Sequence, residues 1–225
     1  MEGTRTFRIG IIRVLTQDQE ATESHGRLIE HWFGQFETVS RSLPDQPEGV
    51  HDPRTKALAV PKVVALAREL ESAGLDGIIV SCADDPGVPE IRAVAHIPVV
   101  GAGEATAQAA LRFGNRIGVL GITETVPASF RRILQDRLVA DIVPEGVSCT
   151  LDLRTDAGHS ATVDAARELA KKDIDAIALA CTGLADANIA PTLERATGVP
   201  VLDPVLCAAH ALLFDLVRGA DTRRA

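Results

Sequence analysis

The chain has 225 residues, of which 46% are hydrophobic and 3% aromatic, and it carries a formal net charge of −8 at pH 7. Its lysines and arginines are scattered and it has no tyrosine, which excludes a nucleic-acid partner, because phosphates need a basic surface and bases need stacking platforms. No apolar run approaches the ~20 residues of a membrane-spanning helix, and no apolar leader precedes the first expected strand. The four cysteines lack close pairing and suit a reducing compartment. We therefore predict a cytoplasmic protein with a small-molecule partner and no membrane partner.

The first predicted elements are a strand and a helix. Phe7 to Leu15 is rich in β-branched residues and predicts a buried strand, with Arg13 near its carboxyl end. Two interpretations of this arginine have about equal weight: a surface residue, or a fork for a carboxylate or ureido oxygen. Glu20 to Phe36 follows helical spacing. Solvated or packing roles are favoured over metal binding for its two histidines, His25 and His31.

The next segments predict a loop and a second helix. Val39 to Arg54 contains three prolines and a glycine, so we expect a loop or short edge strand that is long enough to act as a lid. Lys56 to Ala73 has apolar residues at helical spacing. Gly74 should end that helix as a left-handed cap.

A cysteine follows the next predicted strand. In Leu75 to Val88, LDGIIVSCADDPGV, the run Ile78 to Val80 is too short and too rich in β-branched residues for a helix. Asp85 is placed to cap a helix that begins with Pro86. A thiol between the carboxyl end of a strand and the amino end of a helix lies where open parallel sheets bind ligands. Cys82 is therefore a candidate reactive group.

The remaining elements continue the alternation of strands and helices. The first half ends with a short helix, a strand, and a helix opened by Glu104, for which a role in complementing the helix dipole is favoured over catalysis. We expect Cys149 and Cys207 to be structural. The predicted segments after the Cys82 strand are the helix Pro86 to Ala95, strand Ile97 to Val100, strand Ile117 to Leu120, a helix from near Pro127, strand Val147 to Leu151, helix Ala161 to Lys172, a last strand and helix after Gly198, and a frayed tail from Arg218 to Ala225.

The second half of the chain repeats the first. Ile174 to Ala187, IDAIALACTGLADA, matches the Cys82 segment, so that Asp175 corresponds to Asp76 and Cys181 to Cys82. Two flanking pairs recur in the same order at a separation of roughly a hundred residues: Arg8 to Leu15 with Arg116 to Thr123, and Ile97 to Leu111 with Val199 to Leu213. This internal duplication predicts an α/β fold of two pseudo-symmetric lobes with parallel sheets and the active site in the cleft between them. We expect residues 1–113 and 199–225 in the first lobe and 114–198 in the second.

The paired cysteines favour acid/base chemistry. A disulfide is disfavoured by compartment, and a metal site needs more ligands at short spacing than the sequence offers. Two structural cysteines remain an alternative, although both residues recur at equivalent strand ends. Thiols on opposite faces of a carbon can remove and return its proton, because a cysteine pKa of about 8.5 is readily tuned. Asp84 and Asp85 add negative charge beside Cys82, which favours Cys82 as the resting thiol and Cys181 as the resting base.

Three motifs carry a family resemblance. SCADDPGV, IPVVGAGEA and LACTGLAD resemble signatures of the aspartate/glutamate/hydantoin racemase superfamily, most closely its hydantoin and allantoin racemase branch, from about Lys56 to the last helix. The resemblance implies two flavodoxin-like lobes, cofactor-independent racemisation, and Cys82 and Cys181 as the acid/base pair. It also implies substrate contacts around the strand ends, at Ala83, Asp84, Gly121, Thr123, Thr182 and Gly183.

One segment departs from this family pattern. Hydantoin racemases usually carry Asn-Pro-Asn-Thr after the first strand, and here the four matching residues begin with Arg13 and keep only the threonine, Thr16. An arginine in place of the first asparagine adds a fixed cation. With Arg13 and Thr16 as substrate contacts, the substrate is a carboxylate as readily as a neutral hydantoin.

The favoured prediction is a cofactor-independent racemase or epimerase of a small amino-acid or hydantoin-type substrate. We expect the protein to form a homo-oligomer. The alternatives are a cysteine-dependent decarboxylase or cis-trans isomerase of a small diacid, and a ligand-binding protein without chemistry. Two cysteines argue against the decarboxylase, which needs a single proton donor. Exchange of the hydrogen at the substrate's chiral carbon separates an enzyme from a binding protein.

Overall fold

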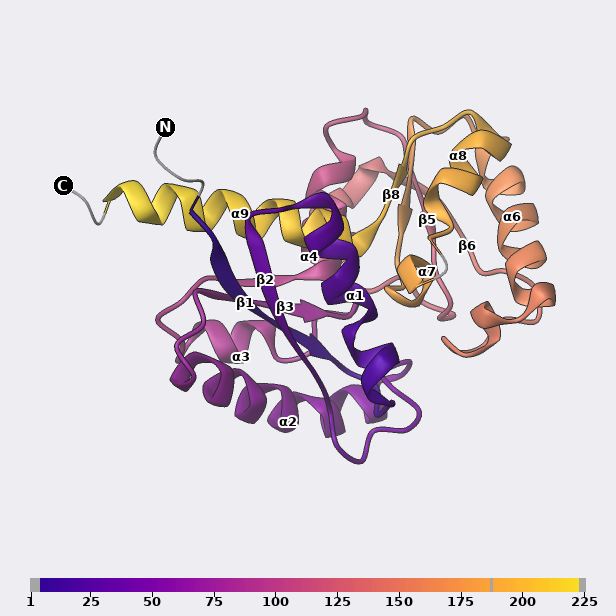
Figure 1. Ribbon diagram of the computed structural model, residues 1–225. Helices are drawn as coiled ribbons and strands as arrows, with labels where there is room; N and C mark the ends of the chain where they lie inside the picture. Colours follow the sequence, from indigo (N-terminus) through magenta and orange to yellow (C-terminus); the bar gives the residue numbers. More distant parts are fainter. Residues whose placement is uncertain (1–4, 187, 223–225) are drawn as a thin grey trace. The chain divides into compact units, whose positions relative to one another are not determined.

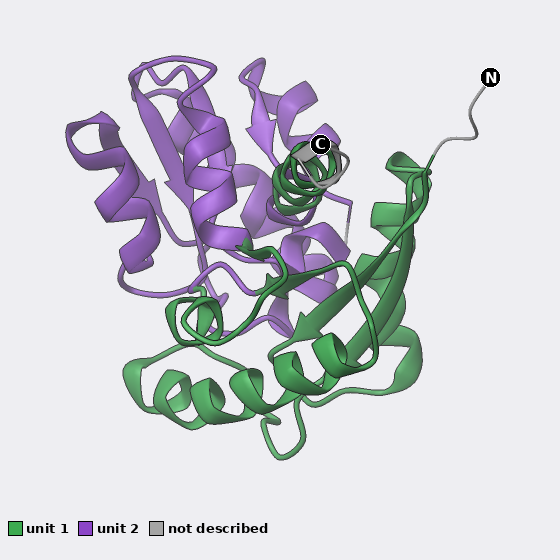
Figure 2. Cartoon of the chain, turned by 90° about the vertical axis from the view of Figure 1, so that its left-hand side faces the viewer, with its two compact units in different colours: residues 1–81, 85–101, 208–225 green, residues 82–84, 102–207 purple. Residues whose placement is uncertain are grey.

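The computed structural model describes residues 5–186 and 188–222 and divides the chain into two compact units (Figure 2). Within the described residues, the first unit takes in the chain up to Ser81, then Asp85–Gly101 and the part from Ala208 onward. The second takes in Cys82–Asp84 and Ala102–Cys207. Each unit holds a four-stranded parallel sheet. The predicted α/β fold of two lobes with parallel sheets is confirmed.

The first unit is built on a sheet with the strand order β2-β1-β3-β4. Its strands are β1 Phe7–Arg13, β2 Phe36–Ser42, β3 Gly77–Ser81 and β4 Val99–Gly101. Its helices are α1 Gln19–Trp32, α2 Pro53–Ser72, α3 Val88–Arg92 and the greater part of α9 Pro204–Thr222. Figure 1 shows α2 and α3 together along one side of this sheet.

The second unit has the equivalent strand order, β6-β5-β7-β8. Its strands are β5 Ile117–Leu120, β6 Leu138–Ile142, β7 Ala176–Leu179 and β8 Val201–Leu202. Its helices are α4 Ala102–Ala110, α5 Ala128–Leu134, α6 Asp156–Ala170, α7 Gly183–Asp186 and α8 Ala190–Thr197, with 3-10 turns η1 Gln135–Arg137 and η2 Asp152–Arg154.

Two apolar cores sandwich the second sheet. Successive residues of a strand point to opposite faces, and β7 divides accordingly: its alanines pack with α4 and α5, while Ile177 and Leu179 pack with α6 and α8. Cys181 continues this alternation on the α6 side, next to Leu184 of α7. The strand therefore delivers the thiol to one defined face of the sheet.

The duplicated aspartates perform the same task in both units. Asp76 exchanges two hydrogen bonds with Arg8: its N–H donates to the Arg8 carbonyl (2.7 Å) and its carboxylate accepts from the Arg8 N–H (2.8 Å). Asp175 does the same with Arg116, at 2.7 and 2.9 Å. Each aspartate thus ties the start of the cysteine-bearing strand to the start of the neighbouring strand.

Several element boundaries differ from the prediction. β2 is an edge strand, one of the two alternatives expected for Val39 to Arg54, although it begins earlier, at Phe36. α2 begins at Pro53 because Asp52 caps it, with its carboxylate accepting from the N–H (2.6 Å) and hydroxyl (2.7 Å) of Thr55. Gly74 has φ +78°, as predicted for a left-handed cap. Within the described residues, α9 continues through Thr222, so the tail expected to fray from Arg218 is helical up to that point, and residues 223–225 lie outside the described part.

Two strand assignments in the second half were wrong. Val147 to Leu151 forms turns rather than a strand, and the strand β6 at Leu138–Ile142 was missed. β6 pairs only with β5, at the edge of the sheet. Its side chains are half-buried or exposed, although four of its five residues are apolar.

The units also differ from the expected lobes. α4 and β8 belong to the second unit rather than to the first. β8 pairs with β7, and Ala107 and Ala110 of α4 pack against the alanines of β7. Among residues 5–186 and 188–222, no helix is long and apolar enough to cross a membrane.

Candidate active site

Cys181 lies just after the carboxyl end of β7, directly before α7. Its side chain is buried, and burial is the main cause that raises the pKa of the thiol, with a further increase from the carboxylate of Asp186. Hydrogen bonds from the N–H groups of Gly183 and Leu184 and from the Thr150 hydroxyl oppose this increase in pKa. A buried thiol with a raised pKa keeps its proton at neutral pH, which favours Cys181 as the resting acid over its expected role as the resting base. The assignment of the two roles stays a prediction.

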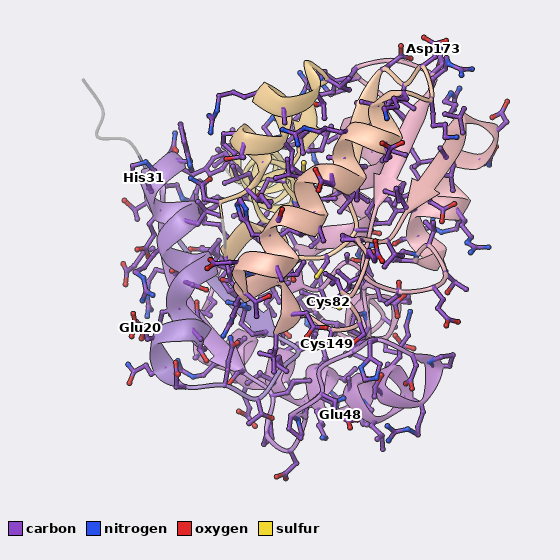
Figure 3. All side chains as sticks on the ribbon, turned by 90° about the vertical axis from the view of Figure 1, so that its right-hand side faces the viewer. Glu20, His31, Glu48, Cys82, Cys149 and Asp173 are labelled. Carbon is purple, nitrogen blue, oxygen red and sulfur yellow. The ribbon has the colours of Figure 1, made fainter. Side chains whose placement is uncertain are left out.

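Cys82 occupies the equivalent position after β3 and is also buried. Figure 3 labels Cys82 together with Asp173, whose highly exposed side chain points into solvent. The carbonyl of Ala83 accepts a hydrogen bond from the Ser129 hydroxyl (3.4 Å). By their contacts Cys82, Ala83 and Asp84 belong to the second unit, which also holds Cys181. The structure therefore groups the two predicted catalytic thiols in one compact unit.

The turn after Cys82 differs from the prediction. Asp85 does not cap the following helix, and that helix does not begin at Pro86. α3 instead begins after Gly87, which has φ +76° and serves as its N-cap without a side-chain hydrogen bond. The Asp85 side chain packs against the backbone of Gly101, where a Cβ would overlap it. Asp84 is half-buried beside this turn.

Arg13 lies at the carboxyl end of β1 and is buried, so its interpretation as a surface residue was wrong. Its guanidinium donates to the Ala21 carbonyl (2.8 Å) and to the Ser24 hydroxyl (2.9 Å), both on α1. The Thr16 hydroxyl is likewise engaged within the first unit: it donates to the Leu43 carbonyl (2.7 Å) and accepts from the Gln46 N–H (2.6 Å). Both residues hold the first unit together, and their contact with substrate stays a prediction.

The loop after β5 carries two more predicted residues. The N–H of Gly121 donates to the Ile142 carbonyl (3.1 Å), and the Thr123 hydroxyl donates to the Thr125 carbonyl (2.8 Å). Both line a small cavity with Asp141 of β6, and its volume of about 10 Å³ suits a single water molecule. This cavity is too small for a substrate.

Thr182 and Gly183 connect Cys181 to α7. Thr182 is half-buried, and its carbonyl accepts from the N–H of Ala185 (3.1 Å). Gly183 is buried, and a Cβ there would overlap the methyl group of Thr150. The glycine therefore leaves room for Thr150 beside Cys181.

Two contacts near the cysteines were missed by sequence reasoning, one from Thr150 and one from His25, for which a solvated or packing role was expected. Thr150 places its hydroxyl 3.9 Å from the Cys181 sulfur. His25 is completely buried, with its Nδ1 2.7 Å from the hydroxyl of Ser81, the residue before Cys82. No motif marks either residue. The positions in the first pair are 31 apart and those in the second pair 56 apart, so only the fold brings them together.

The described residues contain no group of three or more His, Cys, Asp or Glu side chains that could hold a metal ion. All four cysteines are free of disulfides. The groups beside Cys181 are uncharged hydrogen-bond donors and one carboxylate. This environment suits a thiol that takes up and releases a proton.

Comparison with known proteins identifies the family. A family model described as Asp/Glu/Hydantoin racemase matches residues 19–212, a longer stretch than the motifs from Lys56 onward indicated. The chain is 35% identical over 191 residues to the hydantoin racemase of Rhizobium meliloti, covering 78% of this chain and 76% of that protein. It is 28% identical over 171 residues to the hydantoin racemase of Pseudomonas sp. (strain NS671), covering 71% and 66%.

The fold comparison agrees. The allantoin racemase from Klebsiella pneumoniae matches with a TM-score of 0.84 and 23% identity, covering 95% of this chain and 89% of that one. At this level of identity the similarity establishes a shared fold. Taken with the family match and the 35% identical relative, it shows that the chain belongs to the Asp/Glu/Hydantoin racemase family, in its hydantoin and allantoin racemase branch, and is an isomerase.

Proposed function

We propose that this racemase inverts the chiral carbon of a 5-substituted hydantoin, without a cofactor, using Cys82 and Cys181 as its two acid/base groups. The observation that carries the proposal is the equivalent placement of the two thiols. Cys82 follows β3 and Cys181 follows β7, each the third strand of its sheet along the chain. Both thiols are buried, and both belong to the second unit by their contacts. Inversion needs one proton-transferring group on each face of the carbon, and a pair of like groups meets that need.

The reaction is a proton exchange. One cysteine, as thiolate, removes the hydrogen from the carbon next to the ring carbonyl, and the electron pair moves onto the carbonyl oxygen. The other cysteine, as thiol, returns a proton to the opposite face as the carbonyl forms again. At the end the two thiols have exchanged protonation states, so the reverse reaction starts from the opposite face. No electron is gained or lost, which is why the proposal needs no redox group.

The surroundings of Cys181 suit the acid role first. Its raised pKa keeps the proton on sulfur at neutral pH, ready for transfer to the substrate carbanion. When Cys181 acts as base, the N–H groups of Gly183 and Leu184 and the Thr150 hydroxyl stabilise the thiolate. A buried thiolate with a raised pKa is also a stronger base than an exposed one.

A neutral ring is favoured over an acidic amino acid. The cation that led us to consider a carboxylate substrate, Arg13, is buried and donates to two acceptors on α1. The 35% identical relative is a hydantoin racemase. A hydantoin is chiral when its ring carbon 5 carries a single substituent, and that carbon lies next to a carbonyl. The remaining substrate contacts are proposed at Ala83, Asp84, Gly121, Thr123, Thr182 and Gly183, with Arg13 and Thr16 kept as lesser candidates.

Circular dichroism of (S)-5-benzylhydantoin tests the proposal. We expect loss of optical activity well above the uncatalysed rate, and loss of that catalysis in Cys82→Ala and in Cys181→Ala, because inversion needs both groups. Cys207→Ser, on α9 and outside the proposed site, is the control and should keep the parent rate. If the parent protein leaves 5-benzylhydantoin unchanged but racemises allantoin, a hydantoin with a ureido group on carbon 5, the ring is right and the substituent is wrong. If it racemises only an acidic amino acid, the substrate class is wrong and the two-cysteine chemistry stands.

Deuterium exchange in D₂O assigns each cysteine to a face. A serine hydroxyl is a far weaker acid than a thiol, so each Cys→Ser variant should lose its base on one face and keep the thiolate on the other. We expect each variant to exchange the C5 hydrogen of one enantiomer without inversion, and the two variants to prefer opposite enantiomers. Exchange of the same enantiomer by both variants contradicts the two-base mechanism.

Two broader expectations accompany this function. The four free cysteines support a reducing, cytoplasmic location. We also propose a homo-oligomer, which sedimentation would show as a mass at a multiple of 23.8 kDa, and a single species at the mass of one chain would contradict it.

A further inference from the structure

A short segment after β6 reaches the Cys181 thiol. We call residues 148–152 the Cys181 strap. The Asp152 carboxylate fixes it by accepting three hydrogen bonds, from the Ser148 N–H (2.8 Å), the Ser148 hydroxyl (3.0 Å) and the Cys149 N–H (3.0 Å). These bonds hold the pKa of Asp152 below its usual range. The carboxylate is therefore ionised at neutral pH and can accept all three hydrogen bonds.

The far end of the strap is tied to α6. The Asp152 carbonyl accepts from the Thr155 hydroxyl (2.8 Å), and the same hydroxyl accepts from the N–H of Gly158 in the first turn of α6 (3.0 Å). A Cβ on Gly158 would overlap the Asp152 carbonyl. Leu153 is buried in the core that also contains Cys181. The strap is therefore fixed by the Asp152 hydrogen bonds within it, and at its α6 end by further hydrogen bonds and the core packing of Leu153.

Thr150 is the strap residue that touches Cys181, and its two branches contact different groups. Its hydroxyl lies 3.9 Å from the Cys181 sulfur. Its methyl group lies over Gly183, so closely that a Cβ on that glycine would overlap it. The methyl contact fixes the side-chain rotamer, and the rotamer aims the hydroxyl at the sulfur.

We propose that Thr150 is a positioning residue for Cys181: its hydroxyl donates to the Cys181 thiolate during turnover, and its methyl group, seated on Gly183, holds the hydroxyl in that direction. This inference rests on the proposed acid/base role of Cys181. A thiolate in a buried site needs donors to replace water, and a hydrogen bond to a charged group is stronger than one between neutral groups. The strap supplies a donor from outside the strand-turn-helix segment that carries the cysteine.

The test measures thiolate formation directly. Alkylation of Cys181 by iodoacetamide is followed against pH, by mass spectrometry of the peptide that contains it. Thr150→Val keeps the shape of the side chain and removes the hydroxyl, so at a pH below the midpoint we expect alkylation of Cys181 to slow about tenfold. Thr150→Ser keeps the hydroxyl without the methyl and should lie between the parent and Thr150→Val. The matched control is Thr192→Val on α8, which should leave the profile unchanged.

A second-site variant tests the role of the methyl group. Gly183→Ala should displace Thr150 and shift the alkylation profile as Thr150→Val does. Adding Thr150→Ser removes the overlapping methyl and should return the profile toward that of Thr150→Ser alone. If Gly183→Ala does not fold, the two Thr150 variants still decide the matter, since neither adds an atom to the site.

Racemisation separates this inference from the proposed function. In Thr150→Val the rising limb of the pH dependence of kcat should move to higher pH, whereas a purely structural role would change stability or KM and leave that limb in place. An alkylation profile of Thr150→Val equal to the parent's overturns the inference. If the profile shifts but no hydantoin is racemised, the inference stands and the proposed function fails.

Discussion

At the scale of single residues, two aspartates show how local hydrogen bonds set titration. Asp52 caps α2 by accepting from the N–H and hydroxyl of Thr55, and Asp152 accepts three bonds within the Cys181 strap. In both, hydrogen bonds from the backbone are the largest cause that lowers the pKa of the carboxyl group. A carboxyl group with a lowered pKa in the folded state stabilises the fold above its unfolded-state pKa, and that contribution is lost as pH falls through the folded value.

The sign of this linkage gives a pH prediction. The free energy of unfolding, measured by urea titration, should be nearly constant from pH 7 to about pH 5 and fall below about pH 4. The double variant Asp52→Asn, Asp152→Asn should be less stable at pH 7 and show a smaller fall in acid, because an amide cannot be protonated in this range. Asp173→Asn, at a highly exposed site, is the control. A double variant with the parent's acid profile would show that these two carboxylates do not set it.

Cys207 is a second cysteine whose thiol has a raised pKa. Burial, followed by the negative charge of Asp203, raises the pKa of its thiol to about 12, and the Thr106 hydroxyl and Arg112 only partly oppose this. Cys207 was expected to be structural, and its side chain is half-buried. Both Cys207 and Cys181 have raised pKa values. The donors from Gly183, Leu184 and Thr150 distinguish the environment of Cys181.

At the scale of elements, a glycine sets how closely α1 approaches β2. Gly26 is buried in α1, and a Cβ there would lie 2.5 Å from the Thr38 hydroxyl oxygen and 2.7 Å from that of Ser40. Since both are side chains of the adjacent strand, the helix can pack this closely only where its Cβ is missing. The local signals in the sequence, helix caps and apolar spacing, do not indicate this requirement.

This contact predicts a difference between two substitutions near the same helix. Gly26→Ala should lower the free energy of unfolding by about 1–3 kcal/mol, the usual cost of overpacking. Gly34→Ala is the matched control, because a Cβ at Gly34 would meet no atom within 4 Å. Denaturant titration of both variants measures the difference. Equal stability would mean that α1 moves away from β2 without cost.

At the scale of the whole molecule, the same local construction occurs twice. Gly10 in β1 lies beneath Leu70 of α2, where a Cβ would be 2.9 Å from a leucine methyl carbon. Gly118 in β5 lies beneath Leu169 of α6, with the corresponding atom at 2.9 Å from its Cγ. In each unit a glycine in the central part of the sheet allows the helix that precedes the cysteine-bearing strand to approach.

The repeated construction predicts similar costs in the two units. Gly10→Ala and Gly118→Ala should each lower the free energy of unfolding by about 1–3 kcal/mol. Gly118→Ala should cost more, because the branch point of Leu169 has less freedom to move than the methyl end of Leu70. Calorimetry of the two variants, with Gly34→Ala as reference, measures both. A cost in one unit and none in the other would contradict an equivalent role.

The sequence by itself determined the class of fold, the two cysteine-bearing strands and the family. These features depend on local signals: β-branched runs that end at a cysteine, glycines that end helices, and the recurrence of the Asp76 pattern at Asp175. Such signals act over a few residues and are the same whatever the rest of the chain does. The paired positions of Cys82 and Cys181 follow from them directly.

Only the tertiary structure decided which side chains surround those cysteines. Strand order and helix packing bring Thr150 into contact with Cys181, and His25 into contact with Ser81. The guanidinium of Arg13 donates to acceptors on α1, a neighbour that the strand itself does not predict. β6, an edge strand that pairs with β5, was missed although four of its five residues are apolar. Contacts between residues distant in sequence depend on the packing of the whole unit, and a short stretch of sequence carries no signal for them.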